Sequence, residues 1–359
     1  MTPNIFGITN NEKKKKLALI FGVTGQDGSY LVEFLLKKNY IVHGVKRRSS
    51  SENTQRIDHI FDSINFKNSN FFLHYGDITD SSSVFNIINN IKPSEIYNLS
   101  AQSHVRVSFD IPEYTANSTA MGTLRILEAI KSLKLYKTKF YQASSSEMFG
   151  KQKGNKSQNE NTKFHPMSIY GVSKVFAHNT TILYREAYGI FACNGILFNH
   201  ESPRRGPNFV TKKIVEGLVR IKVGLQKKLT LGNLYAVRDW GHAKDYAISM
   251  WKILQYKKPD DWVIATNKEN TVKKFIEVSA KKLSIKIKWV GKGINERGID
   301  VKSGKTIINL DKKYLRPTEV EFLRGNYSKA KRHLKWKPSI STDKLVDDMI
   351  NFEMNKYSS

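Results

Sequence analysis

The sequence predicts an α/β fold, in which a doubly wound parallel sheet is followed by a smaller, interrupted C-terminal domain. Short apolar runs alternate with helical stretches over residues 17–199, which is the pattern of right-handed βαβ crossovers. Beyond residue 199 the alternation breaks down into loops and isolated helices. We therefore place the first domain at 17–199 and the second at 200–359, with segments around 230–265 returning to the first sheet.

The first predicted strand, at residues 17–21, runs into a glycine-rich turn and then an amphipathic helix at 30–38. Its glycines follow the spacing Gly-x-x-Gly-x-x-Gly. They permit a tight turn and let a pyrophosphate approach the backbone at the helix N-terminus. Alone, the loop could be a simple turn, but between a strand and a helix it predicts a Rossmann-type dinucleotide site. The residues expected to bind the cofactor here are Gly22, Thr24, Gly25, Gln26, Asp27 and Gly28.

The second strand ends in two arginines and two serines, namely Arg47, Arg48, Ser49 and Ser50. An acidic residue about 20 positions after the glycines would instead bind the ribose hydroxyls of NAD. Arginines and serines in this place suit the 2′-phosphate of NADP, so we predict NADP as the cofactor. The alternative is a solvated arginine pair.

Four further strands are predicted, at 71–77, from residue 96, at 140–143 and at 191–198. Helical periodicity marks 120–132, 210–223 and 345–354, whereas the Gly- and Lys-rich stretch 291–305 is expected to be a flexible excursion. The ends of the third and fourth strands, rich in small residues, leave room for the cofactor. The contacts expected there are Asp77, Ile78, Leu99, Ser100, Ala101, Gln102 and Ser103.

The chemistry is predicted to lie within residues 140–174, where a strand ends in hydroxyls and one carboxylate and a helix begins after Pro166. Ser168 is the expected N-cap of that helix. Tyr170 and Lys174, four residues apart, would share one helix face. An ammonium beside a phenol favours the phenolate, so we expect the pKa of Tyr170 to move from about 10 toward neutrality. Such a phenol can take a hydroxyl proton while a hydride leaves the same carbon.

Glu147 adds a second base that alcohol oxidation does not need. Each of these features has a plain alternative: Tyr170 and Lys174 could be a surface pair, and Glu147 could be a carboxylate stabilised by a helix start. The strand-end hydroxyls and the glycine loop occur at chain distances that suit one shared site, which favours the catalytic interpretation.

Together these motifs resemble the extended short-chain dehydrogenase/reductase superfamily, and most closely the GDP-mannose 4,6-dehydratases of its NAD-dependent epimerase/dehydratase family. The most specific stretches are 199–206, 238–245 and 316–320. The resemblance runs from about residue 17 to the end of the chain. Ser145 stands where the family commonly has Thr, so the hydroxyl is kept.

The resemblance implies conversion of GDP-mannose to GDP-4-dehydro-6-deoxymannose and water by internal hydride transfer from C4 to C6 through NADP, for deoxysugar biosynthesis of the GDP-fucose or GDP-rhamnose type. It implies the catalytic residues Ser145, Glu147, Tyr170 and Lys174. Further cofactor contacts would be Tyr114, Tyr170, Lys174, His200 and Arg205. The implied substrate contacts, mostly in the second domain, are Ser103, Ser145, Ser146, Glu147, Asn199, Lys213, Arg220, Arg238, Arg316 and Glu319. A homo-oligomer, dimer or tetramer, is also implied, and the tetramer would form partly around the loop at residues 47–51.

Composition limits the other function classes. The formal net charge is +27, but the lysines are scattered and no base-reading motif appears, so we predict a solvated basic surface rather than specific nucleic-acid binding. The single cysteine, Cys193, fits a reducing cytoplasm. We predict no membrane span, since no apolar run approaches ~20 residues, and no metal site, since His/Cys clusters are lacking. Residues 1–16 are predicted to be a disordered basic tail without a signal peptide.

Two rival functions stay open at this point. The chain could catalyse a neighbouring reaction, as another nucleotide-sugar 4,6-dehydratase or a 4-epimerase. It could also be a non-catalytic nucleotide- or polyanion-binding protein on the same scaffold, because a fold alone does not determine function.

Overall fold

The computed structural model describes residues 15–62, 70–315 and 317–357. Its largest element is a seven-stranded sheet with the order β11-β6-β5-β4-β1-β2-β3, in which all neighbouring strands run parallel. The predicted doubly wound parallel sheet is thus confirmed. The strands are β1 (Leu17–Phe21), β2 (Ile41–Lys46), β3 (Phe71–Tyr75), β4 (Glu95–Asn98), β5 (Lys139–Ser145), β6 (Ala192–Leu197) and β11 (Asp261–Ile264).

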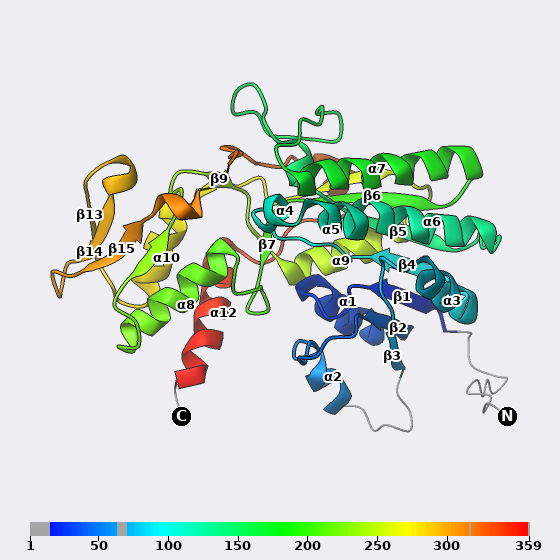
Figure 1. Ribbon diagram of the computed structural model, residues 1–359, viewed down its shortest axis with the longest axis horizontal. Coiled ribbons are helices and arrows are strands. Elements are labelled where there is room, and N and C mark those ends of the chain that lie inside the picture. The colour runs from blue at the N-terminus through cyan, green and yellow to red at the C-terminus, as the bar shows by residue number, and fades with distance from the viewer. Residues whose placement is uncertain (1–14, 63–69, 316, 358–359) are drawn as a thin grey trace.

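Helices cover both faces of this sheet (Figure 1). One face packs against α1 (Gln26–Lys37) and α9 (Ala243–Leu254). The other face packs against α3 (Ser81–Ile91), α6 (Gly122–Ser132) and α7 (Ile169–Tyr188). The short elements α2 (Asp58–Asp62), α4 (Val107–Asp110), α5 (Pro112–Ala116) and the π-turn η2 (Asn117–Met121) connect them. Apolar residues buried on both faces explain why the strands read as nearly continuous hydrophobic runs.

A second lobe lies to the left in Figure 1. Its helices α8 (Val210–Lys222), α10 (Val272–Lys282) and α12 (Thr342–Met354) share one apolar core with the sheet β13-β14-β15-β8. Those strands are β13 (Ile287–Val290), β14 (Arg297–Asp300), β15 (Thr306–Leu310) and β8 (Leu229–Leu231). Two small sheets, β7 (His200–Glu201) with β10 (Gly241–His242) and β9 (Val237–Arg238) with β12 (Asn270–Thr271), join the lobes, and α11 (Ser328–His333) precedes α12. Single turns complete the set, as η3 (Ser146–Met148), η4 (Gly293–Asn295), η5 (Lys312–Tyr314) and η6 (Asn355–Tyr357).

The flexible excursion predicted at 291–305 is wrong, because Arg297–Asp300 forms β14 between two partner strands. Gly298 fits there since its neighbours Ile287 and Ile308 leave little room for a Cβ, a packing demand that a Gly- and Lys-rich composition does not reveal. The predicted tail at 1–16 lies, apart from Lys15 and Lys16, outside the described residues.

Candidate active site

A cavity of about 720 Å³ opens between the two lobes, at the carboxyl ends of the parallel strands. The first domain lines it with the glycine turn after β1, the ends of β4 and β5 and the start of α7. The second lobe contributes Lys213, Leu231, Arg238 and Tyr314. Crevices at this edge of an open α/β sheet are where such folds bind ligands.

The glycine turn fits a dinucleotide. Gly22 has φ +84°, and a Cβ there would lie 2.9 Å from the carbonyl carbon of Leu99. A Cβ on Gly28 would lie 2.4 Å from the Gly22 carbonyl oxygen. Gly25 is the N-cap of α1 and provides no side-chain acceptor for the first-turn N–H groups. Those N–H groups are therefore suited to hold a pyrophosphate, as anions bind at helix N-termini.

Strand β5 and the turn η3 place the hydroxyls and the carboxylate. Pairing of β5 with β6 sets Ser145 opposite Leu197, so the ends of both strands face the same cavity. The Ser145 hydroxyl accepts a hydrogen bond from the Glu147 N–H at 3.2 Å. This local cap starts η3 and turns the buried Glu147 into the cavity lining.

Helix α7 brings the phenol and the ammonium to the same place. Ser168 is its N-cap and accepts a hydrogen bond from the Gly171 N–H at 3.0 Å, which confirms that prediction. Tyr170 and Lys174 are buried and both line the cavity. The Lys174 Nζ lies 5.7 Å from the centre of the Tyr170 ring.

The expected shift of the Tyr170 pKa toward neutrality is wrong for this protein. Burial raises the pKa of Tyr170 to about 12, although a hydrogen bond with Ser145 and the charge of Arg205 oppose the shift. Lys174 donates to the Ala143 carbonyl oxygen at 2.6 Å, and burial lowers its own pKa to about 8. Desolvation of the phenolate therefore outweighs the groups that favour its charge, as expected for a phenol removed from water.

A charged pair lies beside the glycine turn. The His200 Nε2 is 2.7 Å from an Asp27 carboxylate oxygen, and the His200 Nδ1 is 2.7 Å from the Phe198 carbonyl oxygen. Both partners are acceptors, so His200 must donate from both nitrogens, as an imidazolium does. Burial opposes that charge, yet Asp27 raises the pKa of His200 above its usual value.

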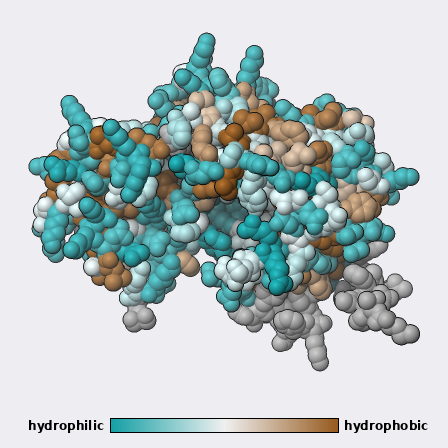
Figure 2. Space-filling model, in the orientation of Figure 1, coloured by the Kyte–Doolittle hydropathy of each residue, from teal (hydrophilic) through white to brown (hydrophobic). Residues whose placement is uncertain are grey.

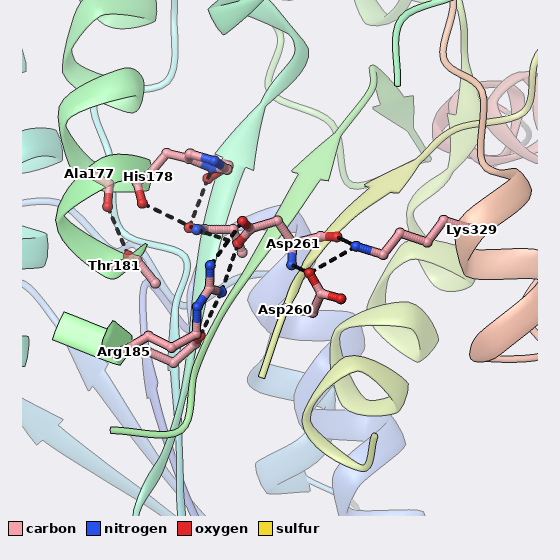
Figure 3. Close-up of polar contacts among 10 residues, drawn as sticks. Ala177, His178, Thr181, Arg185, Asp260, Asp261 and Lys329 are labelled. Atoms are coloured by element: carbon pink, nitrogen blue, oxygen red, sulfur yellow. Dashed lines mark hydrogen bonds and ion pairs between the residues drawn. The ribbon is translucent and has the colours of Figure 1, made fainter. Parts of the chain in front are cut away.

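A largely buried polar network holds α7 against the sheet (Figure 3). Arg185 forms two hydrogen bonds with the Asp261 carboxylate, at 3.0 and 3.1 Å. Asp261 also accepts from Asn194 at 2.8 Å. The Ser144 hydroxyl bonds to both Asn194 and His178. The network thus joins α7 to β5, β6 and β11 and fixes the helix that carries Tyr170 and Lys174.

Comparison with known proteins shows the family of this chain. The family model described as GDP-mannose 4,6 dehydratase matches residues 19–349. The chain belongs to this family. It is 54% identical over 347 residues to the GDP-mannose 4,6-dehydratase of Vibrio cholerae, with 94% of this chain and 93% of that protein covered. The human GDP-mannose 4,6 dehydratase is 52% identical over 344 residues, covering 95% of this chain and 92% of that protein.

Solved structures show the fold of this GDP-mannose 4,6-dehydratase family member. A UDP-glucose 4-epimerase from Thermotoga maritima has a TM-score of 0.79 at 20% identity, covering 95% of this chain and all of that one (100%). A dTDP-glucose 4,6-dehydratase from Bacillus anthracis, in complex with NAD, has a TM-score of 0.77 at 21% identity, with 96% of this chain and 98% of that chain covered. RMD from Pseudomonas aeruginosa, in complex with NADPH, has a TM-score of 0.73 at 18% identity, with 95% of this chain and 100% of that chain covered. Identities this low support the architecture alone.

Most residues singled out in the sequence of this family member lie around this cavity. These are Gly22, Thr24, Gly25, Gln26, Asp27, Gly28, Arg47, Asp77, Ile78, Leu99, Ser100, Ala101, Gln102, Ser103, Tyr114, Ser145, Ser146, Glu147, Tyr170, Lys174, Asn199, His200, Arg205, Lys213 and Arg238. Arg48, Ser49, Ser50 and Arg220 are exposed and do not line it. Glu319 also stays outside the lining but forms an ion pair with Arg238 at 3.0 Å. Arg316 lies outside the described residues.

Sequence reasoning missed several residues of the lining, mainly in the second lobe. They include Glu201, Phe209, Leu231, Gly232, Trp240, Lys313 and Tyr314. The Arg205 guanidinium carbon lies 3.6 Å from the centre of the Phe209 ring. The Lys213 Nζ lies 3.7 Å from the centre of the Tyr314 ring. Aromatic residues near the predicted cationic ligands were the sequence feature that could have indicated these further lining residues.

Two kinds of feature are absent from the part of the chain that the structure describes. No three His, Cys, Asp or Glu side chains come together there as ligands for a metal ion. Among the helices of the same residues, none has the length and hydrophobicity of a bilayer-spanning segment.

Proposed function

We propose that this chain converts GDP-mannose to GDP-4-dehydro-6-deoxymannose and water, with a nicotinamide cofactor held by the glycine turn. The observation that carries the proposal is the buried Glu147 in the same cavity as Tyr170 and Ser145. Oxidation and reduction at one carbon need the phenol alone, whereas loss of water needs a further base. Relatives at 52–54% identity bear the name of this activity.

The side chains divide the proton chemistry between them. A nicotinamide held by the glycine turn would supply the hydride chemistry, which removes hydride at the sugar C4 and delivers it at C6. Tyr170 takes the proton of the C4 hydroxyl, and Ser145 donates a hydrogen bond to the 4-oxygen. The new ketone acidifies the C5–H bond, and Glu147 removes that proton. Glu147 then protonates the C6 hydroxyl as it leaves as water. C5 takes up a proton when hydride is delivered to C6, and this proton balances the one that Tyr170 took from the C4 hydroxyl. Substrate and product therefore differ by one water, and the cofactor is unchanged.

Isotope transfer tests this function. With deuterium at C4 of GDP-mannose, we expect the product to carry the label at C6, because the hydride is moved within one molecule. Mass spectrometry with NMR locates the label. A 4-epimerase would leave deuterium at C4, and a protein without catalysis would leave the substrate unchanged, so either result would reject the proposal.

Within the nicotinamide cofactors we propose NADP. Arg47 lines the cavity, and its guanidinium donates to the Tyr114 hydroxyl at 2.7 Å, which holds it ready for a 2′-phosphate. Glutamine at Arg47 should raise the Kd for NADP roughly 10- to 100-fold with little change for NAD, since a charge-assisted hydrogen bond is lost. Glutamine at the neighbouring Arg48, which does not line the cavity, is the matched control in the fluorescence titration. Equal losses for both cofactors at Arg47→Gln would contradict the assignment.

We also propose a homo-oligomer. Four apolar side chains repeat at helical spacing on the outer face of α7 and are exposed, namely Ile169, Val172, Phe176 and Leu183. Figure 2 shows hydrophobic residues gathered over the start of α7 and the neighbouring α4. An exposed apolar face of this kind favours contact with a second copy. The 47–51 loop, expected from sequence to help form a tetramer, is exposed too.

The oligomer is tested by light scattering after size-exclusion chromatography. We expect the Val172→Glu/Phe176→Glu double variant to run as a monomer, because burying two carboxylates in an apolar contact is unfavourable. A double change of the exposed Lys151 and Lys153 to Glu is the control. A wild-type monomer, or an oligomer unaffected by the α7 change, would contradict the contact.

We propose a cytoplasmic location, because the single cysteine, Cys193, is free and buried. We propose neither a nucleic acid nor a membrane as a specific partner.

A further inference from the structure

The segment 200–205 carries two cationic side chains that line the cavity, His200 and Arg205. His200 pairs with Asp27 of the glycine turn, and Arg205 is among the charges that oppose the rise in the Tyr170 pKa. Gln26 reinforces the link by donating to the His200 carbonyl oxygen at 3.0 Å. The position of this segment therefore affects both the cofactor pocket and the phenol.

Two residues in the first turn of α8 form hydrogen bonds with the 200–205 segment. The Lys212 Nζ donates to the Pro203 carbonyl oxygen at 2.9 Å. One residue earlier, the Thr211 hydroxyl donates to a Glu201 carboxylate oxygen at 2.5 Å. The same oxygen of Glu201 forms an ion pair with the Arg205 Nε at 2.9 Å. Two neighbouring residues of α8 thus fix both the backbone and the charged side chain of the segment.

The counter-charge of Lys212 comes from the last helix. Glu353 on α12 is fully buried and forms an ion pair with Lys212, which is itself buried. The other oxygen of Glu353 pairs with Lys356 at 2.7 Å. Lys212 also lies over the Phe352 ring, 4.8 Å from its centre. The C-terminal helix therefore reaches the 200–205 segment through one ammonium group.

Helix packing alone does not explain this buried pair. Two apolar residues of similar volume would hold α8 and α12 together equally well or better, because buried ions lose their hydration. An apolar residue at position 212 could not, however, donate to the Pro203 carbonyl. The ammonium is needed for the bond to the segment, and Glu353 compensates its charge.

We infer that Lys212 and Glu353 are positioning residues: they form a clamp through which the C-terminal helix sets the 200–205 segment and hence the affinity for the nicotinamide cofactor. The inference rests on the proposed function, since it takes the cavity to bind that cofactor. The clamp acts only through the segment, because Lys212 and Glu353 are not part of the cavity lining.

The test separates stability from binding by replacing both ions at once. The Lys212→Met/Glu353→Leu variant should keep the wild-type Tm within a few degrees, yet its Kd for NADPH should rise about tenfold, as expected for losing one charge-assisted hydrogen bond. Fluorescence titration without substrate measures the Kd, and calorimetry the Tm. Lys282→Met/Asp347→Leu is the control, because that pair joins α10 to α12 at 2.7 Å without contacting the segment.

A conservative variant covers the case in which the double variant does not fold. Lys212→Arg keeps donors for both the Pro203 carbonyl and Glu353, so its Kd should stay within about threefold of wild type, whereas Lys212→Gln at a comparable Tm should show the tenfold loss. A Kd that follows only Tm across these variants, or a double variant that binds as wild type, would overturn the clamp. Wild-type protein that fails to bind NADPH or NADH would instead reject the proposed function.

Discussion

Glutamine in place of Glu147 should lower the overall kcat by about 10³-fold or more while oxidation at C4 continues. General acid–base catalysis contributes about 10² to 10⁴ per group, and here one carboxylate serves both the removal of the C5 proton and the departure of the C6 hydroxyl. Glutamine keeps the shape and the backbone bond to Ser145 but accepts no proton. The bound cofactor should therefore accumulate in its reduced form.

Rapid mixing with GDP-mannose measures this result. Absorbance of reduced nicotinamide follows the first half-reaction, and chromatography of the sugar nucleotides follows release of the product. Glu186→Gln, an exposed carboxylate on α7, is the control and should behave as wild type. Full dehydration by the Glu147 variant would assign the second base to another residue.

Phenylalanine at Tyr170 should lower kcat/KM by about 10³-fold, because the proton acceptor of the C4 hydroxyl is lost.

The kcat/KM of the wild-type enzyme should rise with pH. The pKa of Tyr170 is about 12, so its phenolate fraction, and with it kcat/KM, grows about tenfold per unit as pH rises. Lys174, with a pKa of about 8, loses its charge above that pH, and the rise should flatten there.

Steady-state rates between pH 6 and 9 test the profile. Ser145→Ala should lower the whole curve, since the hydrogen bond that opposes the high Tyr170 pKa disappears. The Tyr170→Phe variant should keep the wild-type Tm, whereas a variant with a disturbed fold would have a lower Tm. A rate that is flat over this range, or that falls as pH rises, would show that Tyr170 is not the proton acceptor.

Local patterns in the sequence were enough for the strands and for the centre of the site. The apolar runs before Gly22 and Ser144 define β1 and β5, and Ser168 marks the start of α7. Such signals lie within a few neighbouring residues, where periodicity, caps and turns are decided by local geometry. The direction of the Tyr170 pKa was not accessible in this way, because it depends on how completely the folded chain removes water.

The second lobe was less predictable for the same reason. The pairing of Lys212 with Glu353 links residues 141 positions apart, and no short pattern connects them. Tyr314 enters the cavity because η5 packs against Gly232, whose missing side chain lets the two backbones approach. Contacts of this kind depend on the whole path of the chain through space.

Strand β11 has a consequence for any attempt to divide this protein. It pairs with β6, although the chain has passed through the second lobe before reaching it. A fragment that stops at residue 199 would leave the backbone groups of β6 open, and an unpaired strand edge invites aggregation. Expression of either half alone should therefore give insoluble material, and a workable split would have to let both pieces meet as they are synthesised.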